Sequence, residues 1–150
     1  MNELSAIVAA LLAPNTEAGV LATLVSVEGS AYRLPGARLL IRPGRPPIGS
    51  VSGGCLEEDL IARAEKVRIT GEPDAVVYDT TSENDLVCGV GLGCHGVVRV
   101  LLERVSPRPP WAVAVANGIA HHRTTAIAVI HGTPDRTEWG TRLAAPGDCP

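Results

Sequence analysis

Two segments rich in glycine and cysteine contain the residues of this chain that could carry chemistry. The first, Ser50–Glu58, reads SVSGGCLEE and leads into a stretch with helical periodicity. Small residues at Ser52, Gly53 and Gly54 let the backbone approach a ligand, and the helix that follows directs its free N–H groups toward the same place. Such a helix end binds anions, so the segment predicts an anion site.

Cys55 falls in the first turn of that helix, where the positive end of the helix dipole favours a thiolate. Glu57 and Glu58 partly oppose this effect, because nearby negative charge favours the neutral thiol. A purely structural interpretation stays open: Ser52 caps the helix, the glycines form a tight turn, and Cys55 is a small buried side chain.

The second segment is Cys88–Gly96, which reads CGVGLGCHG. Alternate glycines, among them Gly91 and Gly93, remove side chains from one side of the loop and expose N–H donors to a phosphate, a pterin edge or an oxyanion. A dinucleotide-binding fingerprint needs a helix after its glycines, but this loop runs into a strand-like sequence. Cys94 and His95 are adjacent, which is poor spacing for zinc ligands, and we expect no metal site. The structural alternative is close packing of the glycine backbone on a sheet.

Arg33 and Arg38 flank the loop of a predicted hairpin, and the guanidinium group of either could hold an anionic group with two hydrogen bonds. Solvated surface arginine is the alternative for both. The remaining histidines lie in predicted connections or at strand ends and are equally consistent with structural roles.

The elements that must position these residues follow from periodicity, caps and turn residues. We predict helices over Glu3–Leu12 (capped by Asn2), Cys55–Ile69 (ended by Gly71) and Trp111–Asn117 (ended by Gly118). We predict strands over Val20–Val27, Ala37–Arg42, Ala75–Asp79, Val97–Val105, Thr124–His131 and Glu138–Ala144, a turn over Pro43–Gly49 and a long loop over Thr80–Gly96. The pattern favours an α/β fold of the layered α+β type, in which helices pack on a mixed β-sheet, without a Rossmann domain.

The composition limits the class of protein. The chain has 150 residues, 45% of them apolar, which is typical of a single domain. Aromatic residues make up only 3% and the net charge is −3, so a nucleic-acid partner is not expected. The N-terminal apolar stretch lacks a basic start and is cut by Pro14, which predicts neither a signal peptide nor a membrane span and hence a cytoplasmic protein. The four cysteines are too few for a disulfide scaffold.

Three segments together, VEGSAYRLPGARLLI, GSVSGGCLE and GVGLGCHG, resemble the N-terminal domain of the XdhC/CoxI family of xanthine dehydrogenase accessory proteins. The resemblance covers roughly Gly19 to Glu103. It implies a maturation chaperone, not a turnover enzyme, which binds molybdenum cofactor (molybdopterin), protects it during sulfuration and delivers it to a molybdenum hydroxylase of the xanthine or CO dehydrogenase type. A cysteine desulfurase is a candidate further partner.

The resemblance also implies which residues contact the cofactor. A phosphate or oxo group would lie near Ser52–Gly54, with the thiols of Cys55 and Cys94 lining the same cleft; whether these thiols contact molybdenum, relay sulfur or only line the site stays open. The cofactor-binding residues expected are Ser52, Gly53, Gly54, Cys55, Glu57, Gly91, Gly93, Cys94, Arg33 and Arg38.

Two departures from the family pattern leave alternatives open. The family commonly continues into a second, Rossmann-like domain, whereas we expect residues 1–150 to form a single domain without it; His95 stands where the family more often has glycine. One alternative is a small sulfur-transfer or acyl-transfer enzyme with Cys55 as nucleophile and His95 as base. Another is a non-catalytic docking module for a partner that carries the second domain, and a homodimer is one form that it could take.

Overall fold

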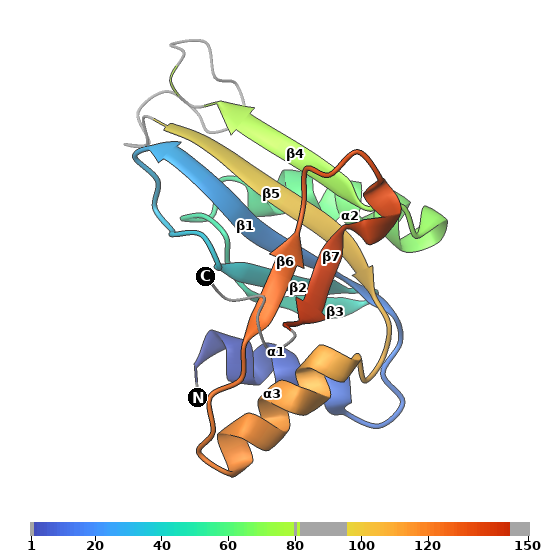
Figure 1. Cartoon of the computed structure of the whole chain (residues 1–150). Coiled ribbons are helices and arrows are strands. Elements are labelled where there is room, and N and C mark those ends of the chain that lie inside the picture. Colours follow the sequence, from blue (N-terminus) through green and yellow to red (C-terminus); the bar gives the residue numbers. More distant parts are fainter. Residues whose placement is uncertain (1, 80, 82–95, 145–150) are drawn as a thin grey trace.

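The computed structural model describes residues 2–79, 81 and 96–144, and Figure 1 shows their arrangement. The helices are α1 (Glu3–Leu12), α2 (Glu57–Thr70) and α3 (Pro110–Ala120), with a short 3₁₀ turn at Arg136–Glu138. The strands are β1 (Gly19–Gly29), β2 (Arg38–Arg42), β3 (Arg45–Gly49), β4 (Asp74–Asp79), β5 (Gly96–Val105), β6 (Ile127–Ile130) and β7 (Gly140–Leu143).

Five strands form one sheet in the order β3-β2-β1-β5-β4, and β6 pairs with β7 in a separate two-stranded sheet. Every pairing in the described part of the chain is antiparallel. The predicted layered fold of a sheet with packed helices is therefore confirmed, and the parallel pairs that a mixed sheet could contain do not occur among these strands.

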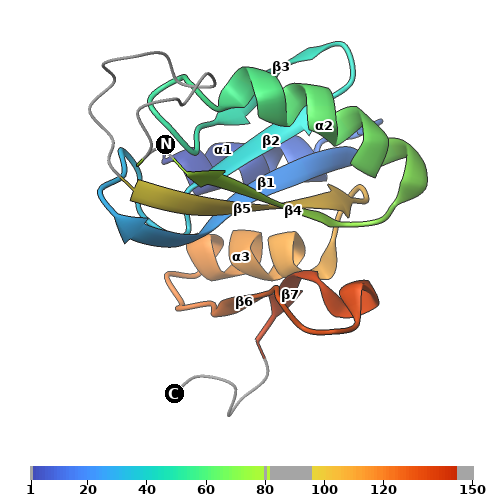
Figure 2. The same cartoon turned by 90° about the horizontal axis from the view of Figure 1, so that it is seen from above.

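The two faces of the large sheet carry separate apolar clusters. Helix α2 covers one face, where Leu39 and Leu102 are buried, whereas α1 and α3 cover the other, where Leu21 and Leu40 are buried. Figure 2 shows α2 on one side of the sheet and α3, followed by the β6–β7 pair, on the other. Because side chains alternate along a strand, neighbouring residues of β2 enter different clusters.

Two helix ends follow their sequence signals closely. The side chain of Asn2 accepts a hydrogen bond from the N–H of Ser5 (2.8 Å), which confirms the predicted cap of α1. Gly71 ends α2 with φ +75°, and its N–H donates to the carbonyl of Val67 (2.9 Å). This left-handed conformation suits glycine, so the predicted end of α2 is also confirmed.

Three predictions were wrong in detail. Pro43–Gly49 is not only a turn, because Arg45–Gly49 forms the edge strand β3, a position at which prolines are tolerated. Helix α3 continues through Gly118, which is buried; a Cβ there would lie 2.2 Å from Oγ1 of Thr125, so close packing explains this glycine. Helix α2 begins at Glu57 instead of Cys55.

A buried carboxylate joins β7 to the large sheet. Glu103 on β5 is only 8% exposed and accepts hydrogen bonds from the backbone N–H (2.8 Å) and hydroxyl (2.5 Å) of Thr141. Burial raises the pKa of Glu103, although the hydrogen bonds and the charge of Arg38 act in the opposite direction. The docking of β7 thus depends on a polar contact as well as on apolar packing.

None of the helices in the described ranges is long and apolar enough to cross a membrane.

Candidate functional site

The predicted site residues between β3 and the first turn of α2, Ser52–Cys55 and Glu57, lie at one end of the large sheet. There β1 ends at Gly29, opposite Gly96 at the start of β5, and β4 ends at Asp79, opposite Val97. In Figure 1 these three strands meet at the upper left. Strand β3 ends at the same end of the sheet, because Gly49 pairs with Leu39 near the start of β2. The chain from Gly49 to α2 is therefore held close to the loop that follows β1.

The carboxylate of Glu57 organises the segment between β3 and α2. Its Oε1 accepts hydrogen bonds from the hydroxyl of Ser50 (2.9 Å) and from the N–H groups of Val51 (3.1 Å) and Ser52 (3.0 Å). Its Oε2 accepts a further, short bond from the hydroxyl of Ser52. Four donors on three consecutive residues thus converge on one carboxylate, which fixes the course of the loop.

These bonds also set the charge state of Glu57. Burial acts to raise its pKa, but the hydrogen bonds from Ser52 and Ser50 outweigh burial, so the pKa lies below the ordinary value for glutamate. The ionised carboxylate is consequently the form that holds the loop.

The hydroxyl of Ser52 organises the remainder of the loop. Its Oγ accepts hydrogen bonds from the N–H groups of Gly54 (3.1 Å) and Leu56 (3.2 Å). Within the described residues, the N–H groups of Gly53 and Cys55 have no hydrogen-bond partner. The N–H groups of Gly54 and Leu56 are therefore used inside the loop, whereas those of Gly53 and Cys55 are available to a ligand.

Gly53 and Gly54 expose the loop backbone. Both residues are exposed, and Gly54 adopts φ +113° with no atom within 4 Å of the position of a Cβ. A side chain at Gly54 would be strained by this conformation, not by a clash. The backbone is thus open to approach at the point where the sequence predicts an anion.

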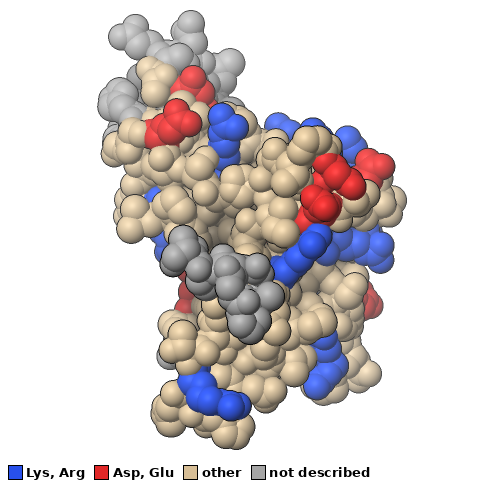
Figure 3. Space-filling view, in the orientation of Figure 1, with Lys and Arg blue, Asp and Glu red and all other residues tan. Residues whose placement is uncertain are grey.

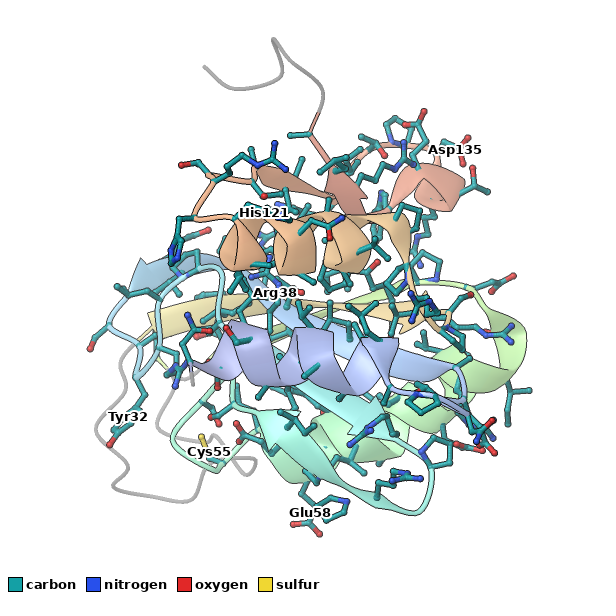
Figure 4. All side chains as sticks on the ribbon, turned by 90° about the horizontal axis from the view of Figure 1, so that it is seen from below. Tyr32, Arg38, Cys55, Glu58, His121 and Asp135 are labelled. Atoms are coloured by element: carbon teal, nitrogen blue, oxygen red, sulfur yellow. The ribbon has the colours of Figure 1, made fainter. Side chains whose placement is uncertain are left out.

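Tyr32, in the β1–β2 loop, is a residue that sequence reasoning did not assign to the site. Its ring lies over Gly53, where a Cβ would come within 3.3 Å of ring atom Cγ, and the side chain is nevertheless 75% exposed. Figure 4 shows Tyr32 and Cys55 at the same end of the molecule. The available signal was the scarcity of aromatic residues, since the chain has only two tyrosines and one lies inside the SAYRLPG motif.

Cys55 is half-buried and packs against the apolar cluster beneath α2. Its thiol makes no hydrogen bond to any of the described residues. Cys55 and the two glycines before it therefore share one loop, and Cys55 lies before the first turn of α2 instead of within it, as the sequence predicted. The described part of the chain supplies no base in hydrogen-bonding contact with the thiol.

The two predicted arginines do not join Cys55. Arg33 forms an ion pair with Glu3 of α1 (2.5 Å). Arg38 lies on the sheet face that carries Leu40, opposite the α2 side, and its Nη1 donates to the carbonyl of Gly36 (3.0 Å). Burial lowers the pKa of Arg38, partly offset by the charge of Glu103, and Figure 4 shows Arg38 on the α3 side of the sheet.

The second predicted constellation lies outside the described residues, including Gly91, Gly93 and Cys94, together with Cys88 and His95. The structure does describe the strand ends on either side of it, Asp79 of β4 and Gly96 of β5. At Gly96, a Cβ would come within 2.5 Å of the carbonyl oxygen of Ser30, so the start of β5 packs closely against the loop that contains Tyr32. Contacts thus connect Gly96 to Ser30 and Tyr32 to Gly53.

Comparison with known proteins shows similarity to one family over part of the chain. Residues 12–79 match the model of the XdhC and CoxI family. The chain is 43% identical over 95 residues, 63% of its length, to a Bacillus subtilis protein named as a probable xanthine dehydrogenase subunit. It also superimposes with a TM-score of 0.62, at 42% identity over 71% of its length, on a crystal structure titled as a xanthine dehydrogenase from Bacillus halodurans.

The matched region spans only 29% of the Bacillus subtilis protein and 31% of the Bacillus halodurans chain. Residues 12–79, which match the family model, include β1, the β1–β2 loop and the loop that contains Cys55. The resemblance to the XdhC and CoxI family that the sequence motifs predict is therefore confirmed over residues 12–79.

Proposed function

We propose that the chain is an accessory factor that binds molybdenum cofactor and assists its sulfuration and insertion into an enzyme of the xanthine or CO dehydrogenase type. The observation that carries this proposal is the loop between β3 and α2. This loop lies within the residues that match the family model and contains Gly53, Gly54 and Cys55. Hydrogen bonds from its backbone to the carboxylate of Glu57 fix its conformation.

The residues of this loop suit an anionic, partly aromatic ligand. The free N–H groups of Gly53 and Cys55 would donate to the phosphate or to an oxo group of the cofactor, as backbone N–H groups near a helix N-terminus do. The exposed ring of Tyr32 would offer a flat surface to the pterin, because offset stacking of π systems is favourable. Ser52 and Glu57 support the loop, since their oxygen atoms are engaged within it.

When bound, the cofactor supplies the molybdenum centre of the client enzyme. The chain would hold the cofactor at one end of the sheet, exposed enough for transfer. The thiol of Cys55 would line the site, and Cys94 and the glycines before it are proposed to approach from the segment between β4 and β5. The client is proposed to be a molybdenum hydroxylase, and a cysteine desulfurase is a candidate sulfur donor.

The proposal is tested by measuring retention of released molybdenum cofactor by purified protein, using ultrafiltration and absorbance. Wild-type protein should retain about one cofactor per chain, and Cys55→Ala and Cys94→Ala should each weaken retention. Tyr32→Ala should weaken binding by about tenfold, because loss of one stacking surface costs about 1–2 kcal/mol.

Leu34→Ala is the matched control. Leu34 lies in the same loop as Tyr32 and is equally exposed (77%), so its removal should leave retention unchanged. Folded wild-type protein that retains no cofactor would contradict the proposed function. Equal losses in the Tyr32 and Leu34 variants would instead contradict the assignment of Tyr32.

A further inference from the structure

The tip of the β2–β3 hairpin lies at the end of the sheet opposite the Cys55 loop, and two cavities open beside it. One, of about 350 Å³, lies between the tip and α2 and is lined by Ile61 and Arg68 among others. The other, of about 540 Å³, lies between the tip and the α1–β1 connection, residues 13–17. Arg42–Arg45 lines both cavities, so the tip separates two concave surfaces.

Arg42 and Arg45 have no ion-pair partner in the part of the chain that is described. The two residues face each other in the β2–β3 pairing, and the buried Nε of Arg42 makes no hydrogen bond. By contrast, Arg68 is paired with Glu65 through two bonds of 2.9 and 2.6 Å. The tip therefore holds two guanidinium groups whose hydrogen-bonding capacity is unused.

The cavity beside α2 combines these charges with apolar walls. Val20, Ile41 and Ile61 contribute to the walls, and Ile61 is 41% exposed. Three arginines and one glutamate line the cavity, which gives it positive charge on a chain whose net charge is −3. Figure 3 shows basic and acidic side chains together at the right-hand end of the molecule, where the hairpin and the end of α2 lie in Figure 1.

We propose that the hairpin tip is a docking site for an acidic peptide segment of a partner protein, one that places an apolar side chain in the cavity beside α2 and carboxylates against Arg42 and Arg45. This site is separate from the proposed cofactor site and does not depend on it. The positive charges of Arg42 and Arg45 favour a partner segment that carries carboxylates. Because cavities lie on both sides of the tip, an extended segment that crosses the tip could contact both of them.

The partner segment is recognised by its side chains and not by strand addition. Strand β3 is the outer strand of the sheet, but Pro46 and Pro47 have no N–H groups to donate to an added strand. An apolar side chain in a half-open pocket, flanked by Arg–carboxylate contacts, is the remaining mode of binding that this surface supports.

The proposal is tested by titrating isotope-labelled protein with a hexapeptide of alternating glutamate and leucine, acetylated and amidated, and following backbone amide shifts. Shifts are expected at Ile41, Arg42, Gly44 and Arg45 and at residues 61–68, with weaker binding at higher salt. The Arg42→Gln/Arg45→Gln double variant should bind about tenfold more weakly, because two carboxylate contacts are lost.

Two comparisons separate this account from nonspecific charge attraction. Arg63→Gln removes an arginine of α2 that pairs with Asp59 (2.7 Å) and lines neither cavity, so it should leave binding unchanged. A peptide with glutamine in place of glutamate should not bind. The proposal is overturned if the acidic peptide does not bind wild-type protein, if the shifts fall elsewhere, or if the double variant binds as tightly as Arg63→Gln.

Discussion

Glu57→Ala is expected to lower the free energy of unfolding by about 2–4 kcal/mol and to abolish cofactor retention. The substitution removes the acceptor of the N–H groups of Val51 and Ser52 and of the Ser52 hydroxyl, and unsatisfied buried donors are costly. The Ser50 hydroxyl keeps a second acceptor, the carbonyl of Ser52 (2.6 Å). The loop would then no longer hold Gly53 and Cys55 in place. Denaturant unfolding and the retention assay measure the two effects.

Glu58→Ala provides the control, because Glu58 is the adjacent residue, is exposed and points outward in Figure 4. Its free energy of unfolding should change by less than about 0.5 kcal/mol. The account of the loop fails if the two variants lose equal stability, or if Glu57→Ala keeps wild-type stability and retention.

The lowered pKa of Glu57 adds a pH signature to the same prediction. A carboxylate whose folded pKa is below its unfolded pKa stabilises the fold above the unfolded value, and the stabilisation is lost as pH falls through the folded value. The stability difference between wild type and Glu57→Gln should therefore be largest near neutral pH and shrink in acid.

Gly96→Ala is the second substitution with a large expected effect, a loss of about 2–3 kcal/mol in the free energy of unfolding. Its Cβ would meet the carbonyl oxygens of Ser30 (2.5 Å) and Glu28 (2.6 Å), which are backbone atoms and cannot move aside like a flexible side chain. The ends of β1 and β5 would be forced apart. Cofactor retention should fall as well, because the same contact packs the start of β5 against the β1–β2 loop that contains Tyr32.

Gly132→Ala separates this clash from the ordinary cost of replacing a glycine. Gly132 has φ +76° but no atom within 4 Å of a Cβ, so only its backbone conformation is penalised, by about 1 kcal/mol. Thermal unfolding of both variants gives the comparison. A loss at Gly96 no greater than that at Gly132 would show that β1 and β5 do not approach so closely.

Local signals were sufficient for the elements that begin or end with a specific side-chain or backbone bond. Asn2 predicts the start of α1 because its side chain can accept the Ser5 N–H, and Gly71 predicts the end of α2 because it adopts a left-handed conformation. Strand β3 was missed because Pro46 and Pro47 look like turn residues, and only tertiary structure shows that they lie at a sheet edge.

In the candidate site, too, some features follow from the local sequence and others need the tertiary structure. The sequence predicts that Ser52–Gly54 and Cys55 are adjacent at the start of a helix. It does not show which helix covers each face of the sheet, so it could not show that Arg38 faces away from α2. The spacing of residues also could not show that the side-chain oxygen atoms of Glu57 and Ser52 accept hydrogen bonds from the loop itself. The contact of Tyr32 with Gly53 joins residues from two different loops and needs the fold.

The most direct test of the central claim is to locate the cofactor on the protein. Addition of molybdenum cofactor to isotope-labelled protein should shift the backbone amides of Tyr32, Gly53, Cys55 and Gly96. The amides of Arg42, Gly44 and Arg45 at the distant hairpin tip should stay unchanged. Shifts confined to the hairpin tip, or the absence of shifts around Gly53 and Cys55 when the cofactor is bound, would contradict the claim that this end of the sheet holds the cofactor.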